Sequence, residues 1–383
     1  MRFADAVGAP GFGAIAEFKR RSPSAGDLRP GGDVAAVARA YEANGARAMS
    51  VLVDERFAGT WDDLRAARAA TSLPLLAKGF FSTPEHLRTA KEAGADAALL
   101  ILRDLDDATC ASLMREAGAL GLDTLVEAHD EGELARATAL GAPVIGINAR
   151  DLSTFQVDRR AQLALLARAP GDRVVVAESA IETRAQGAAA ELTGANAILV
   201  GSTLMRAPDP GRKLAELVSR PLVKVCGLTR QEDVDVAVDA GADLVGFILA
   251  RESPRRTDAL LDAPATVLRV AVFVGEEHET DADVVQFYAR ERDHRARDGV
   301  LRRNGAEVAT VVDLPWEDDD PSHLQRAGAT PGRVMLAGGL GPGNVRAAID
   351  AVRPWAVDSA RSTERSPGVK DHDAVRAWVV SAR

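Results

Sequence analysis

The sequence predicts an α/β protein of two consecutive (β/α)8 TIM-type barrels, of which the second is shortened and possibly incomplete. Short apolar segments alternate with helical segments, polar residues follow the ends of the apolar segments, and the pattern restarts near residue 221. Apolar strands alternating with amphipathic helices are typical of a parallel sheet covered by helices. The 383 residues, 46% of them hydrophobic, suit two domains of about 200 residues each.

The first half supplies eight strand–helix units, which fit a closed barrel better than an open, doubly wound sheet. Residues 84–95 and 130–142 place apolar side chains at helical spacing, and their closing Gly-Ala pairs suit a helix end before the next strand. The expected strands are 13–19, 48–54, 73–79, 97–103, 123–129, 143–149, 173–179 and 197–203.

The carboxyl ends of these strands carry polar groups, and in a barrel those ends form the active site. Any one of them alone is typical of a rim residue, but their recurrence at the same end predicts a shared cavity. Buried lysines and glutamates shift one another's pKa values and so separate acid from base roles. Small residues after the last two strands predict a phosphate site. The residues at these ends are Glu17, Lys19, Asp54, Lys78, Glu127, Asn148, Arg150, Glu178, Ser179, Gly201 and Ser202.

The second half shows seven candidate strands and a charged interval between Tyr288 and Arg333. Residues 219–383 are fewer than the roughly 250 of a usual barrel, so one strand–helix unit is expected to be missing or degraded. The candidate strands are 221–229, 243–249, 269–275, 283–288, 307–314, 333–340 and 355–360.

Cys226 and Asp313 follow strands of this second half. A thiolate and a carboxylic acid across a barrel mouth can move a proton between adjacent carbons. The alternative is that Cys226 is a small buried hydrophobe.

Composition limits the other classes of function. A net charge of −9 argues against a general nucleic-acid partner. The two cysteines suggest neither a disulfide framework nor a zinc site, which favours a reducing compartment. No apolar run approaches the roughly 18 residues of a membrane span, and the first residues lack a signal-peptide core, so a cytoplasmic protein without a membrane partner is expected. The six histidines are scattered, and no metal or cofactor is expected.

The first half resembles the indole-3-glycerol phosphate synthase family over nearly its whole length. The matching motifs, in order, are IAEFKRRSPS, SVLVDERFAGTWDDL, PLLAKGFF, GADAALLIL, LVEAHDEGEL, GINARDLSTF, VVAESAI and ILVGSTLM. The resemblance implies a decarboxylating lyase that closes the ring of carboxyphenylamino-deoxyribulose phosphate and then dehydrates it to the indole.

Carried over by position, the resemblance implies a role for each polar residue. Lys78 is the general acid of ring closure, and Lys19 binds the substrate carboxylate and assists later proton transfer. Glu17 and Glu127 serve as base and as stabiliser of the anilinium-like intermediate, and Glu178 supports the lysines. Asn148 and Arg150 orient the substrate, while the phosphate is bound by Ser22, Ser179, Gly201 and Ser202.

Three departures from the family pattern stand out. The first strand starts near residue 14, without the family's longer N-terminal extension and its helix. Gly79 replaces an Asp in KGF, and Ala180 replaces a Gly in AESAI. Because glycine usually allows special backbone angles or close contact, weaker phosphate binding is expected at Ala180.

The second half resembles phosphoribosylanthranilate isomerase through VKVCGLTRQEDV, GFILARESPRR, VAVFVG, LAGGLGPGNV and VDSARSTERSPGVKD. This resemblance implies an Amadori isomerisation with Cys226 as general base and Arg255 on the anthranilate carboxylate. Asp313 is then the general acid, unless its segment is the strand before the acid's strand. Phosphate would be bound by Gly338 and Gly339, with Arg361 in place of a Ser-Gly contact.

The whole chain therefore resembles a fusion that performs two successive steps of tryptophan biosynthesis, with residues 1–218 as synthase and 219–383 as isomerase. Phosphorylated small molecules are the expected partners, and the sequence leaves the oligomeric state open. Two alternatives remain: a synthase with a catalytically silent C-terminal domain, or a non-catalytic phosphosugar-binding protein.

Overall fold

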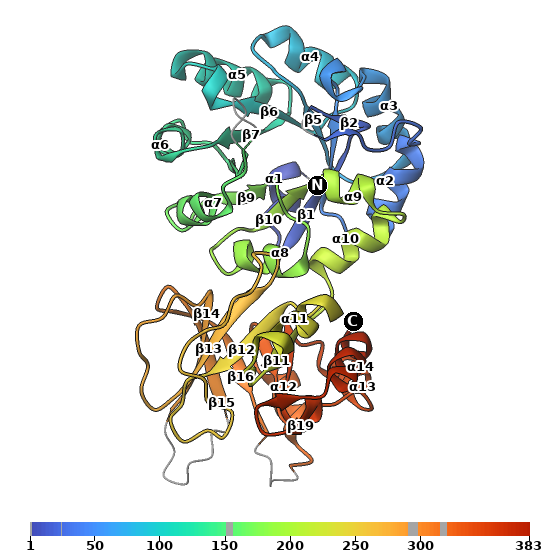
Figure 1. The fold of residues 1–383 in the computed structure, drawn as a ribbon. Helices are drawn as coiled ribbons and strands as arrows, with labels where there is room; N and C mark the ends of the chain where they lie inside the picture. Colours follow the sequence, from blue (N-terminus) through green and yellow to red (C-terminus); the bar gives the residue numbers. More distant parts are fainter. Residues whose placement is uncertain (1, 24, 151–155, 290–297, 315–319) are drawn as a thin grey trace. The chain divides into compact units, whose positions relative to one another are not determined.

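The computed structural model describes residues 2–23, 25–150, 156–289, 298–314 and 320–383, so the end of the GINARDLSTF motif, residues 151–155, lies outside it. The chain divides into two compact units, residues 1–182 with 190–218 and residues 219–383 with 183–189. Each unit contains a closed eight-stranded barrel (Figure 1). The predicted fold class, two barrels in succession, is confirmed.

The first barrel is parallel throughout. Each strand pairs with its sequence neighbour, and the first pairs with the last to close the sheet. All but two of the positions in these strands are fully buried, because the sheet is covered on both faces. The strands are β1 (Gly13–Phe18), β4 (Ala48–Leu52), β5 (Leu75–Lys78), β6 (Ala97–Ile101), β7 (Asp123–Ala128), β8 (Val144–Asn148), β9 (Val174–Glu178) and β10 (Ala197–Val200).

Side-chain caps determine where several helices of the first half begin. Asp33, Thr60, Asp106, Asp130 and Asp158 each accept a hydrogen bond from a backbone N–H of the first turn. The helices after the strands are α2 (Val34–Ala43), α3 (Trp61–Ala70), α4 (Pro84–Glu92), α5 (Asp107–Ala119), α6 (Glu131–Ala139), α7 (Arg159–Leu166), α8 (Arg184–Glu191), α9 (Ser202–Arg206) and α10 (Pro210–Val218).

The core of the first barrel has two layers. One lies between sheet and helices, and the other fills the barrel interior with side chains such as Ile15, Leu99 and Val176. Helix α1 (Phe3–Val7) precedes β1 and adds Phe3 and Val7 to the interior layer. The interior is therefore a packed floor on which polar side chains at the carboxyl ends can be positioned.

The second sheet also closes with eight strands, so the count of seven was one short. The missed strand is β15, which lies in the charged interval and runs antiparallel to both neighbours. Asn304 and Gly305 join it to β16 with φ angles of 51° and 79°, as a two-residue hairpin turn requires. The strands are β11 (Leu222–Cys226), β12 (Leu244–Ile248), β13 (Leu268–Val274), β14 (Val284–Tyr288), β15 (Asp298–Arg303), β16 (Ala306–Val312), β17 (Val334–Leu336) and β18 (Ala356–Ser359).

The shortening of the second domain falls on its helices. Helices follow β11, β16, β17 and β18, whereas the described residues between β12 and β14 form no helix. The helices are α11 (Gln231–Ala240), α12 (His323–Ala329), α13 (Val345–Val352) and α14 (His372–Ala382). Trp378 of α14 is fully buried, and its indole N–H donates to the carbonyl of Lys224 at 3.1 Å. The side of this barrel that helix α14 covers is therefore well packed.

Within the described residues, every helix is too short or too polar to cross a membrane.

Candidate active site

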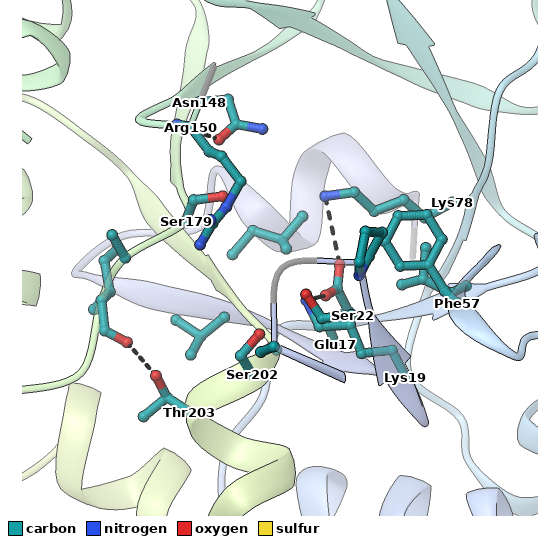
Figure 2. Close-up of a pocket in the computed structure, with 18 of the residues that line it drawn as sticks. Glu17, Lys19, Ser22, Phe57, Lys78, Asn148, Arg150, Ser179, Ser202 and Thr203 are labelled. Atoms are coloured by element: carbon teal, nitrogen blue, oxygen red, sulfur yellow. Dashed lines mark hydrogen bonds and ion pairs between the residues drawn. The ribbon is translucent and has the colours of Figure 1, made fainter. Parts of the chain in front are cut away.

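A cavity of about 510 Å³ opens at the carboxyl ends of the first barrel's strands. Its size is within the usual range for small-molecule sites. All but two of the residues predicted for this site, Asp54 and Glu178, line it: Glu17, Lys19, Ser22, Lys78, Glu127, Asn148, Arg150, Ser179, Gly201 and Ser202. Figure 2 shows Asn148, Arg150 and Ser179 on one side of the cavity and Glu17, Lys19 and Lys78 on the other.

The floor of the cavity is an ion cluster centred on Lys78. Its ammonium Nζ lies 2.8 Å from Glu178 Oε2, 3.4 Å from Glu17 Oε2 and 4.0 Å from Glu127 Oε2. Lys19 Nζ lies 2.7 Å from Glu17 Oε1, as expected for residues i and i+2 at a strand end. Glu178, which is fully buried, does not line the cavity itself but contacts Lys78 from below.

Mutual charge separates the pKa values within the cluster. Burial lowers the pKa of Lys78, but its three carboxylate neighbours outweigh burial and raise the pKa above its usual value. Burial raises the pKa of Glu17, yet Lys19 and Lys78 bring it below normal. Burial together with the nearby Glu127 charge raises the pKa of Glu178 despite Lys78. The cluster thus contains a cationic Lys78 and carboxyls whose pKa values are displaced in opposite directions.

Two glycines make room for the carboxylates. A Cβ on Gly201 would lie 2.2 Å from Glu17 Oε1, and a Cβ on Gly146 would lie 2.0 Å from Glu178 Oε1. Gly201 was predicted to contact phosphate. Because it has no side chain, it also leaves space for the Glu17 carboxylate. Gly146 was not singled out, because a glycine within an apolar strand gives no sign of its neighbour on the adjacent strand.

The loops after β9 and β10 form the expected phosphate end. Ser179 and Ala180 both adopt left-handed backbone angles, with φ of 70° and 52°. Thr203 Oγ1 donates to the carbonyl of Ile181 at 2.7 Å, which joins the two loops. Arg206 also lines the cavity and was missed as a candidate anion ligand.

An apolar wall completes the cavity, and the polar motifs gave no indication of it. Its side chains include Leu52, Phe57, Phe80, Leu99 and Ile101. Such a wall suits an aromatic ring. The aromatic residues of the DERF and KGFF segments were the available signal.

Local contacts explain the orientation of the Asn148 amide, the position of Asp54 and the need for a small residue at Gly79. Arg150 N–H donates to Asn148 Oδ1 at 2.9 Å, which orients the amide. Asp54, expected at a strand end, instead pairs with Arg56 at 2.9 Å and caps a short helical turn. A Cβ on Gly79 would lie 2.8 Å from Phe81 Cε1, so a family-like Asp there would require Phe81 to move.

In the second barrel, Lys224 is the centre of a buried polar chain. Its Nζ donates to Gln286 Oε1 at 2.6 Å and pairs with Asp358 Oδ2 at 2.9 Å. Cys226, two residues further along β11, is buried beside it: a Cβ on Gly246 would lie 2.8 Å from both Cys226 Sγ and Lys224 Cε. Burial raises the pKa of the Cys226 thiol, and Lys224 opposes this rise.

The polar chain continues to Asp313. Gln286 Nε2 donates to Tyr288 Oη at 2.6 Å, and Tyr288 Oη donates to Asp313 Oδ2 at 2.8 Å. Burial raises the pKa of Asp313 to about 7, partly offset by the Tyr288 hydrogen bond. Asp313 directly follows β16, the sixth strand of this barrel. The sequence had left open whether its segment was the strand before the acid's strand, and Gln286 and Tyr288 were missed.

Arg255, expected to bind a carboxylate, is paired with one already. Its guanidinium forms a two-pronged ion pair with Glu364 at 2.8–2.9 Å, and Lys370 shares that carboxylate at 3.1 Å. A Cβ on Gly227 would lie 2.9 Å from Arg255 Cδ, so Arg255 lies against the loop that follows Cys226. The pair holds the guanidinium beside this loop.

The expected phosphate loops of the second barrel are joined by Ser359, whose Oγ donates to the carbonyl of Leu340 at 3.1 Å. Gly338 and Gly339 have φ of 80° and 65°, and a Cβ on Gly338 would lie 2.4 Å from the backbone of Leu314. Gly338 therefore also allows close packing beside Asp313. Ser359 Oγ lies 2.6 Å from Ser362 Oγ, whereas Arg361 is exposed.

Comparison with known proteins identifies the first domain. The family model of indole-3-glycerol phosphate synthase matches residues 2–217. The chain belongs to the indole-3-glycerol phosphate synthase family. It is 46% identical to indole-3-glycerol phosphate synthase of Mycobacterium ulcerans over 211 residues, which cover 55% of this chain and 78% of that protein. It is 45% identical to indole-3-glycerol phosphate synthase 2 of Streptomyces coelicolor over 217 residues, 56% of this chain and 84% of that protein.

A second family model matches the C-terminal part of this synthase-family chain. The N-(5'-phosphoribosyl)anthranilate isomerase model matches residues 320–381. Solved phosphoribosylanthranilate isomerases from Thermotoga maritima and Thermus thermophilus are 28% and 27% identical, with TM-scores of 0.32 and 0.35. Each match covers 42% of this chain, with 98% and 97% of the respective isomerase. The two family models confirm the predicted fusion and the assignment to tryptophan biosynthesis.

Proposed function

We propose that residues 1–218 convert carboxyphenylamino-deoxyribulose phosphate to indole-3-glycerol phosphate in the cavity around Lys78. One observation carries this proposal: a buried ammonium within 4.0 Å of three carboxylates lies at the floor of a cavity with an apolar wall. The wall suits the aryl ring, and the loops after β9 and β10 suit the phosphate. Ser22, Ser179, Gly201 and Ser202 are the proposed phosphate ligands, with Arg206 in addition.

Ring closure forms a bond between the ring carbon that bears the carboxylate and the ketone carbon of the sugar chain. Lys78 donates a proton to the ketone oxygen, which becomes a hydroxyl. The cationic state of Lys78 suits this role, because it also stabilises charge developing on that oxygen. Lys19 binds the departing carboxylate, and loss of carbon dioxide restores the aromatic ring. Asn148 and Arg150 orient the chain.

Dehydration completes the indole. The new hydroxyl leaves as water after accepting a proton, while the carbon between the nitrogen and the hydroxyl-bearing carbon loses a hydrogen to a carboxylate, and the ring double bond forms between these two carbons. Glu17 and Glu127 are the proposed base and stabiliser, since both have lowered pKa values and are ionised at neutral pH. Glu178, with its raised pKa, supports Lys78.

We further propose that residues 219–383 isomerise phosphoribosylanthranilate and so supply the synthase substrate. Asp313 is the proposed acid that opens the sugar ring, and Cys226 the base that removes a proton from the adjacent carbon. The supporting observation is the chain of hydrogen bonds from Lys224, beside Cys226, to Asp313. Arg255 is assigned to the carboxylate, and Gly338, Gly339 and Arg361 to the phosphate end.

Assays of the purified chain with each substrate test both proposals. Indole-3-glycerol phosphate from carboxyphenylamino-deoxyribulose phosphate supports the synthase. Its formation from phosphoribosylanthranilate supports the isomerase as well. Product from neither, with a folded chain, favours the phosphosugar-binding alternative. We place the reaction in the cytoplasm, where both free cysteines, Cys110 and Cys226, would stay reduced.

A further inference from the structure

His129 lies directly behind the synthase cavity, and none of the assigned roles involves it. It follows β7, and its side chain is only 3% exposed. Imidazole Nε2 lies 3.1 Å from Glu127 Oε1, and Nδ1 lies 3.0 Å from Glu133 Oε2. The backbone N–H of His129 donates to the same Glu133 oxygen at 2.8 Å, which fixes the loop onto helix α6.

Both ring nitrogens of His129 therefore lie at ion-pair distance from carboxylate oxygens; Nδ1 is hydrogen-bonded to Glu133, whereas the Nε2 contact with Glu127 is not aligned as a hydrogen bond. A neutral imidazole carries a proton on only one nitrogen, so its other lone pair would face a carboxylate. The doubly protonated ring avoids this repulsion. Consistent with this geometry, Glu127 and Glu133 outweigh burial and raise the pKa of His129 to about 9.

The His129 ring lies closer to the Glu127 carboxylate than the Lys78 ammonium does. Lys78 lies 4.0 Å from Glu127 and is closer to two other carboxylates. On the far side, Arg103 lies 3.5 Å from Glu133, so that carboxylate has a second partner. Burial raises the pKa of Glu127, but His129 and Lys78 together lower it.

We propose that the His129 imidazolium is a positioning residue that keeps Glu127 ionised and directed at Lys78 during ring closure and dehydration. The proposal rests on the synthase function of this cavity. Ionised Glu127 is needed twice: it helps to hold Lys78 cationic, and it stabilises positive charge on the substrate nitrogen. The pKa values of the buried Glu127 and Glu178 are displaced in opposite directions, and His129 favours the ionised form of Glu127.

The test is the pH profile of synthase turnover in His129→Gln. Glutamine retains a polar side chain but cannot become a cation. The acid limb of kcat is expected to move to higher pH by about one unit or more, which is about a tenfold loss at the acid end, with recovery toward pH 9. KM should change less than about twofold, since His129 does not line the cavity. A uniform loss without a shifted limb, or no change, would overturn the proposal.

His372→Gln is the matched control. His372 also pairs with a buried carboxylate, Asp233 at 3.0 Å, but it belongs to the second barrel. The synthase pH profile of this variant should equal that of the unaltered chain. An equal shift in both variants would contradict a specific role for His129.

A second measurement needs neither a folded variant nor activity. In ¹⁵N NMR spectra of the unaltered chain, with histidines assigned through the backbone, His129 should be doubly protonated at pH 8. A neutral ring at that pH would overturn the proposal even in an active synthase. If the chain converts neither substrate, the synthase function fails, while this spectrum still decides the charge of His129.

Discussion

Each of the two barrels has eight strands and a predicted site at the strand ends, but the two differ in the helices and loops around the sheet. The first is parallel throughout, and each strand from β1 to β10 is followed by a helix. The second has one antiparallel strand, and helices follow β11, β16, β17 and β18. Every residue predicted for its site is either the last residue of β11 or lies after β12, β16, β17 or β18. The reduction therefore falls on β13 to β15, from which no predicted site residue comes.

This difference shows which part of a barrel the chemistry depends on. Helices are retained behind strands whose ends or loops carry predicted site residues, with the loop after β12 as the exception. Arg255 in that loop is fixed by Glu364 instead of by a helix. The region from β13 to β15 contributes Gln286 and Tyr288 of β14, whose side chains point inward and connect Lys224 to Asp313. The reduced region thus still supports the site through its interior face.

The largest expected effect is the loss of synthase activity while isomerase activity is unchanged. Lys78→Met should lower synthase kcat roughly 10³-fold or more, because it removes the proposed acid and the charge at the developing alkoxide. Isomerase turnover, measured as conversion of phosphoribosylanthranilate, should stay the same. Lys91→Met, an exposed lysine on α4, is the control. Retention of synthase activity in Lys78→Met would remove Lys78 from its assigned role.

Asp313→Asn should lower isomerase turnover by about 10²- to 10⁴-fold and leave the synthase intact. An acid must be protonated to act, and the pKa of Asp313 is about 7, so isomerase activity should fall as the pH rises through about 7. Tyr288→Phe removes a hydrogen bond that stabilises the carboxylate and should move this limb to higher pH. A pH profile that is the same in Tyr288→Phe would contradict the role of the polar chain.

Gly146→Ala tests whether the regular barrel depends on space for Glu178. Its Cβ would overlap Glu178 Oε1, so the variant should lose about 1–3 kcal/mol of unfolding free energy, together with synthase activity. Gly118→Ala is the control, because a Cβ there meets nothing within 4 Å and the residue lies within α5. That variant should be slightly more stable in the same urea titration. Equal stability of the two variants would show that Glu178 moves freely.

The smallest expected effect concerns Ala180. Its left-handed backbone, with φ of 52°, costs about 1 kcal/mol, so Ala180→Gly should gain a fraction of that after the entropy of glycine in the unfolded chain is counted. Ala58→Gly has the same backbone angle and should give a similar gain, but it does not line the cavity. Only Ala180→Gly should lower the synthase KM. A lower KM in both variants, or in neither, would contradict a phosphate contact at this loop.

The sequence alone was sufficient to predict strands and site residues where an apolar segment ends in a polar residue. All eight strands of the first barrel, and the convergence of Glu17, Lys78 and Glu127, follow from apolar segments that end in polar residues. It failed for β15, whose segment DGVLRR buries only Leu301, exposes Asp298 and leaves Arg302 and Arg303 half-buried, so that no apolar run marks the strand. Gly146 and Tyr288 were missed for a shared reason: each acts on a side chain, Glu178 and Asp313, that only the folded sheet brings near. Pairwise distances of this kind are not encoded in local patterns. His129 lies two residues from Glu127 and four from Glu133, so its local spacing was an available signal that was overlooked.

The most direct test of the account is a pair of assays on one preparation of the purified chain. One starts from phosphoribosylanthranilate and the other from carboxyphenylamino-deoxyribulose phosphate. The account predicts indole-3-glycerol phosphate from both, with Lys78→Met blocking both and Asp313→Asn blocking only the first. Product from the second substrate alone would contradict it, because a barrel that retains its polar chain would then be catalytically silent.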